Sequence, residues 1–77
     1  MRKHKSMELK GQILEQFGKE YETLINSDNN EIKITQLVKE IIIKQLTLSN
    51  IDVTNIEPGN ITVSDGKVYL DWFEESK

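Results

Sequence analysis

The chain has 77 residues, a net charge of −3 at neutral pH, no cysteine and one histidine. This length fits a single small domain, and the composition excludes disulfides, thiolate metal sites and, because His4 is alone, a histidine-based metal site within one chain. A core of this size rarely contributes more than about 3–5 kcal/mol of stability, so we expect a homodimer or an obligate partner.

Charge is unevenly distributed along the chain. The first ten residues carry a net charge of +3 and the remaining residues a net charge of −6. Residues 1–5, which contain Arg2, Lys3 and Lys5, are predicted to form a disordered basic arm before one domain over residues 6–77. No apolar run has transmembrane length, and no hydrophobic signal segment follows the basic start. We therefore expect a cytoplasmic protein without a membrane partner.

Residues 6–25 have the apolar spacing of an amphipathic helix, with charged residues on the opposite face. Ser6 is a candidate N-terminal cap. Gly11 and Gly18 lie inside the predicted helix, where they either weaken it or permit another backbone to approach closely. The apolar face consists of Leu9, Ile13, Leu14, Phe17, Tyr21, Leu24 and Ile25.

The most apolar stretch of the chain predicts a second helix over residues 31–47, with its start open between Asn29 and Gln36. Its apolar side spans about half of the circumference, which is wider than the band of an ordinary surface helix. Ile43 lies almost opposite Ile34, where a charged residue is usual. We therefore expect two bodies to cover this helix: the first helix on one side, and a sheet, a second copy or a partner on the other.

The C-terminal part of the chain carries a hairpin signal. Asp65-Gly66 separates two alternating segments and is typical of a two-residue type I′ turn. The expected strands are residues 60–64 and 67–73. The turn sets their register, which pairs Val63 with Val68, Ile61 with Leu70 and Thr62 with Tyr69.

Residues 51–55 are predicted as a third strand, joined to the hairpin by a loop over residues 56–60. The elements then form an α+β domain in which two antiparallel helices pack on one face of a three-stranded antiparallel β-meander, in the order ααβββ. In this arrangement Trp72 faces the helices, whereas Tyr69 and Phe73 point away from them.

No group of residues predicts catalysis. His4 is the only imidazole, the four glycines are isolated, and residues 28–31 lack the glycine and the ligand alternation of a calcium loop. We therefore expect a non-enzymatic protein that holds no cofactor and no metal.

A winged-helix-like DNA-binding transcriptional regulator is the alternative, with its wing at residues 64–67. Residues 46–66, where a recognition helix and wing would lie, contain no lysine or arginine, although DNA affinity depends largely on such residues. Only Arg2, Lys3 and Lys5 could then contact phosphate. A third hypothesis, an acidic DNA mimic, rests on six acidic residues against two lysines from residue 51 onward.

The remaining features favour protein binding. Tyr69 and Phe73 are expected to form an exposed aromatic pair with an acidic rim, and Ile43 offers a second apolar surface. We predict a small interaction module that self-associates or binds a host protein. The absence of alanine and the abundance of isoleucine, lysine and asparagine indicate an AT-rich genome, as in a phage or prophage of a low-GC bacterium. The predicted contact residues are Ile43, Tyr69, Phe73, Asp71 and Glu74, with Glu75 completing the rim.

Overall fold

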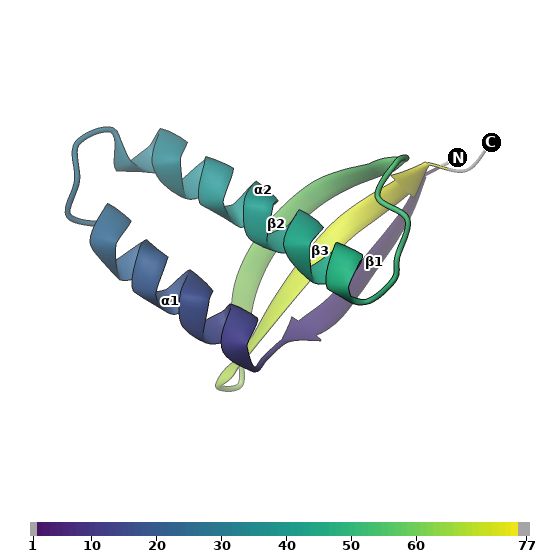
Figure 1. Cartoon of the computed structure of the whole chain (residues 1–77), viewed down its shortest axis with the longest axis horizontal. Helices are drawn as coiled ribbons and strands as arrows, with labels where there is room; N and C mark the ends of the chain where they lie inside the picture. Colours follow the sequence, from purple (N-terminus) through teal and green to yellow (C-terminus); the bar gives the residue numbers. More distant parts are fainter. Residues whose placement is uncertain (1, 76–77) are drawn as a thin grey trace.

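The computed structural model describes residues 2–75. The strands form one antiparallel sheet in the order β1-β3-β2, and both helices lie on the same side of this sheet (Figure 1). The protein is therefore α+β, as predicted, but its element order is βααββ and not ααβββ. The sheet is not the predicted meander, because β1 precedes the helices and pairs with β3. In chain order the elements are β1 (Arg2–Leu9), α1 (Gln12–Leu24), α2 (Asn30–Leu48), β2 (Ile56–Ser64) and β3 (Lys67–Glu75).

The N-terminal strand is the largest departure from the sequence prediction. Residues 2–5 begin β1, so the predicted disordered arm is wrong for them; residue 1 lies outside the described residues. β1 pairs with β3 along its whole length. Its basic side chains thereby meet acidic ones, and Lys5 Nζ lies 3.4 Å from Glu74 Oε2. This pairing joins the two ends of the chain, so no local pattern reveals it.

Gly11 separates β1 from α1, so the predicted helix over residues 6–25 begins only at Gln12. The φ and ψ angles of Gly11 are 81° and −153°, far from the helical region and costly for any other residue. The apolar spacing hides this break, because Leu9 and Ile13 are both buried although one lies in the strand and the other in the helix. Ser6, expected to cap a helix, lies within β1.

α2 packs against both α1 and the sheet. Its C-terminal half crosses the sheet, whereas its N-terminal half and most of α1 extend beyond the sheet (Figure 1). The helix begins at Asn30 and ends at Leu48, close to the predicted range. The core lies under its C-terminal half and consists of Leu9, Ile13, Leu37, Ile41, Ile42, Leu46, Leu70 and Trp72.

The β2–β3 hairpin has the predicted register, with Val63 opposite Val68, Ile61 opposite Leu70 and Thr62 opposite Tyr69. Asp65 and Gly66 have φ angles of 52° and 75°, as a type I′ turn requires. Because side chains alternate along a strand, this register turns the buried Leu70 and Trp72 toward the helices and Tyr69 and Phe73 toward the opposite side.

Residues 51–55 form no strand, so the predicted third strand is wrong there. The Asp52 carboxylate accepts hydrogen bonds from the Thr54 hydroxyl at 2.6 Å and from the Thr54 backbone N–H at 2.9 Å. This local turn occupies an N–H that a sheet would need. The same two bonds, the hydroxyl first, lower the pKa of the Asp52 carboxyl from its ordinary value. β2 then starts at Ile56, within the segment 56–60 that was predicted as a loop.

β2 contains a bulge between Pro58 and Ile61. The Asp71 carboxylate fills the bulge, and its Oδ1 accepts a hydrogen bond from the Asn60 backbone N–H at 2.9 Å. A Cβ on Gly59 would lie 1.8 Å from that same oxygen. Only glycine therefore fits at this position of the bulge.

Candidate interaction surface

The C-terminal half of α2 packs on one face of the sheet, and no other element within residues 2–75 covers the opposite face (Figure 1). We call this opposite face the outer sheet face. Strand alternation and the pairing register place every second residue of each strand on it. Its side chains are those of Arg2, His4, Ser6 and Glu8 from β1, Lys67, Tyr69, Asp71, Phe73 and Glu75 from β3, and Glu57, Thr62 and Ser64 from β2.

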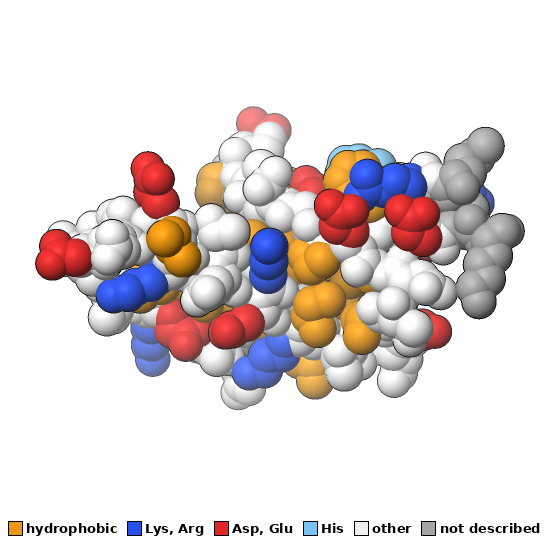
Figure 2. All heavy atoms as spheres, turned by 90° about the horizontal axis from the view of Figure 1, so that it is seen from above, with side chains coloured by type: hydrophobic (Ala, Val, Ile, Leu, Met, Phe, Trp, Pro, Cys, Tyr) orange, Lys and Arg blue, Asp and Glu red, His pale blue; other side chains and the backbone are white. Residues whose placement is uncertain are grey.

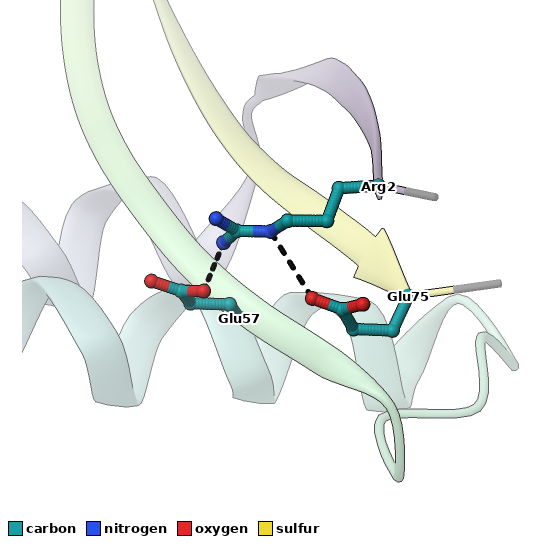
Figure 3. A network of polar contacts seen from close by, with 3 residues as sticks. All are labelled: Arg2, Glu57 and Glu75. Atoms are coloured by element: carbon teal, nitrogen blue, oxygen red, sulfur yellow. Dashed lines mark hydrogen bonds and ion pairs between the residues drawn. The ribbon is translucent and has the colours of Figure 1, made fainter.

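At one end of the outer sheet face, Arg2 connects all three strands (Figure 3). Its guanidinium contacts the Glu57 carboxylate of β2, and its Nε lies 3.2 Å from Glu75 Oε1 of β3. Arg2 Cζ also lies 4.6 Å from the centroid of the Phe73 ring. Phe73, Glu57 and Glu75 together form what we call the Phe73 seat, which combines an aromatic ring with two carboxylates around one guanidinium.

His4 lies at the same end of the outer sheet face and contacts β3. Its ring centroid lies 5.0 Å from that of Phe73, and its Nε2 lies 3.7 Å from Asp71 Oδ1. Figure 2 shows this cluster, in which the histidine lies beside hydrophobic atoms and near a basic side chain flanked by two acidic ones. The placement of His4 in a disordered arm is therefore wrong.

Tyr69 occupies a second aromatic position, four residues before Phe73 on the same strand. Its cross-strand partners are Glu8 in β1 and Thr62 in β2. Directly opposed residues have Cβ atoms about 4.5–5.5 Å apart, so both partners lie beside Tyr69 on this face. Asp71 lies between the two aromatic residues on β3. Tyr69, Asp71 and Phe73 thus share one face, as the sequence predicted, and all three are half-buried.

Two predicted contact residues lie elsewhere. Glu74 faces the helix side of the sheet, where its carboxylate contacts Lys5 and accepts a hydrogen bond from Trp72 Nε1 at 3.3 Å. Its predicted place beside the aromatic pair is therefore wrong, because alternation along β3 turns it inward. Ile43 lies on α2, is half-buried, and is separated from the outer sheet face by the sheet itself.

Sequence reasoning missed Arg2 and Glu57 as parts of this surface. Arg2 reaches it only because β1 is a strand, and Glu57 because β2 starts earlier than predicted. The available signal was charge complementarity between the basic N-terminal segment and the acidic end of β3.

The projecting part of the helices offers a second, apolar surface. Tyr21, Ile25 and Ile32 are 41%, 42% and 64% exposed, although the sequence places the first two on a core-facing side. A groove of about 470 Å³ also runs between α1 and α2, with Lys19, Glu20, Lys33 and Glu40 among its lining residues.

Within residues 2–75, no group of three or more histidine, aspartate or glutamate side chains could hold a metal ion. No helix in this range is long and apolar enough to cross a membrane. No family model, curated protein or solved structure matches the chain.

Proposed function

We propose that this chain is a non-enzymatic protein-interaction module that binds another protein through the outer sheet face. The observation that carries the proposal is the position of Tyr69 and Phe73 on a sheet face that no described element covers. The solvated face of an antiparallel sheet usually carries polar side chains. Aromatic anchors surrounded by charged groups are instead the usual composition of a contact hot spot.

Both edges of the sheet are protected against strand pairing, which favours the face over the edges as the contact surface. The free edge of β1 carries Lys3 and Lys5, and the free edge of β2 contains Pro58 and the bulge beside it. Lysine, proline and bulges on edge strands are common means of preventing another chain from adding a strand.

The projecting helices support the homodimer that the sequence predicts. Tyr21, Ile25 and Ile32 are exposed there, and Ile43 is half-buried. A second copy that covered these side chains would add apolar burial that a core of this size lacks.

The winged-helix-like regulator has less support. α1 and α2 lie side by side and roughly antiparallel (Figure 1), whereas the helices of a DNA-binding helix-turn-helix cross at about 90–120°. In addition, Arg2 and Lys5, which would have to contact phosphate, already form ion pairs with carboxylates of β2 and β3.

The proposal is tested by comparing Tyr69→Ala and Phe73→Ala with the wild-type chain and with Thr47→Ala, a control on the exposed side of α2. Light scattering coupled to size exclusion measures self-association, and affinity capture from a low-GC bacterial lysate identifies other bound proteins. We expect Thr47→Ala to keep the bound protein and both aromatic variants to lose it. If both aromatic variants keep every contact of the wild type, the proposal is wrong.

A further inference from the structure

The outer sheet face has two aromatic positions, and a guanidinium of this chain contacts one of them. Arg2 lies against Phe73 between the carboxylates of Glu57 and Glu75. This contact shows that the outer sheet face can bind a guanidinium. The planar guanidinium stacks on the ring while its N–H groups donate to neighbouring carboxylates.

Tyr69 has comparable surroundings. Glu8 lies directly opposite it in β1, and Asp71 is the next residue of β3 on the same face. Asp71 is held in place by its hydrogen bond with the Asn60 backbone N–H, so its carboxylate is already oriented. We call Tyr69, Glu8 and Asp71 the Tyr69 seat, and it lies about 13 Å along the strand from the Phe73 seat at the usual rise per residue.

The chain cannot fill the Tyr69 seat with an arginine of its own. Arg2 is the only arginine in the sequence. Lys67 is the neighbouring cation on the same face, but an ammonium group lacks the planar fork that stacks on a ring and pairs with carboxylates. A second copy of this chain would bring only another Arg2, which its own β2 and β3 already engage.

We propose that the Tyr69 seat binds an arginine side chain from a basic, extended segment of a partner protein. This inference rests on the proposed function and names the chemistry of the partner. Charge complementarity supports it, because the outer sheet face carries four acidic residues against Arg2 and Lys67. The tyrosine supplies the stacking surface, and Glu8 and Asp71 accept hydrogen bonds from the guanidinium.

The test uses the whole chain and two synthetic peptides, one alternating arginine and serine and the other alternating lysine and serine. Backbone amide shifts in NMR titrations locate the site and give the affinity. We expect the arginine peptide to shift the amides of Glu8, Tyr69 and Asp71 and to bind about threefold more tightly than the lysine peptide.

Variants separate stacking from charge. Tyr69→Leu removes the ring while keeping an apolar side chain, and should weaken the arginine peptide about threefold to tenfold, whereas Tyr69→Phe should keep its binding. Glu8→Gln should weaken it about threefold. Glu22→Gln makes the same charge change at an exposed position of α1 and should leave the affinity unchanged.

Equal binding of the two peptides, or equal loss in Glu8→Gln and Glu22→Gln, would show attraction by net charge alone and would overturn the inference. If the arginine peptide does not bind although Tyr69→Ala still releases the protein partner, the arginine site is wrong and the interaction module stands. If Tyr69→Ala and Phe73→Ala keep every partner of the wild type, both proposals fall.

Discussion

The two faces of the sheet are stabilised by different interactions, apolar burial on the inner face and ion pairs on the outer face. On the inner face, Leu70 is fully buried and Trp72 is nearly so, and both pack against helix side chains. On the outer face, Phe73 and Tyr69 are only half-buried, and Arg2 pairs with carboxylates that are themselves exposed. Apolar burial contributes far more stability than exposed ion pairs. We therefore expect the inner face to determine whether the chain folds and the outer face to determine what it binds.

The largest expected difference between the faces comes from neighbouring residues of β3. Leu70→Ala should lower the free energy of unfolding by about 2–5 kcal/mol, because it leaves a cavity in the core. Tyr69→Ala, one residue away on the outer face, should lower it by about 1 kcal/mol or less. Urea unfolding followed by circular dichroism measures both. Equal losses would mean that the outer face is also part of the stabilising core.

In the bulge of β2, Gly59→Ala should lower the free energy of unfolding by about 1–3 kcal/mol. The new Cβ would lie 1.8 Å from Asp71 Oδ1 and 2.9 Å from the Asp71 backbone oxygen. Only the first contact disappears when the Asp71 side chain is removed. The double variant Gly59→Ala, Asp71→Ala should therefore be more stable than the sum of the single changes predicts. Strict additivity in urea unfolding would contradict this account of the bulge.

The different forces also explain what could be predicted from the sequence. The hairpin register follows from a two-residue turn and from alternation, which are both local, so the placement of Tyr69, Asp71 and Phe73 on one face was predicted correctly. The presence and approximate range of α2 follow from its own apolar spacing, whereas the sequence leaves its start, observed at Asn30, open between Asn29 and Gln36. β1 has no such local signal, because its partner strand lies at the other end of the chain and because helical spacing continues through Gly11.

The Phe73 seat could not be predicted for the same reason. It requires Arg2 from β1, where no strand was predicted, and Glu57 and Glu75, which lie outside the predicted strands 60–64 and 67–73. Glu74 and Glu75 are adjacent in sequence, and only the register shows which of them faces outward. A site formed by residues of several strands is therefore harder to predict from the sequence than the buried face of a single helix.

Arg2→Gln changes an interaction on the outer face alone. Because the ion pairs of Arg2 are exposed, the free energy of unfolding should fall by less than about 1 kcal/mol, and the loss should shrink as salt is added. The same change vacates the Phe73 seat. The arginine peptide should then shift the amides of His4 and Phe73 in addition to those near Tyr69. A stability loss comparable with that of Leu70→Ala would mean that Arg2 anchors β1.

The smallest expected effect lies in the loop that belongs to neither face. Hydrogen bonds from Thr54 lower the pKa of the exposed Asp52 carboxyl in the folded chain. A carboxyl whose folded pKa lies below its unfolded pKa stabilises the fold above the unfolded value, and this contribution is lost as the pH falls through the folded value. Asp52→Asn keeps an oxygen acceptor but removes the charge. The melting temperatures of the two chains should therefore differ slightly at neutral pH and converge in acid, as thermal unfolding at several pH values would measure. A difference that grows as the pH falls would contradict the lowered pKa.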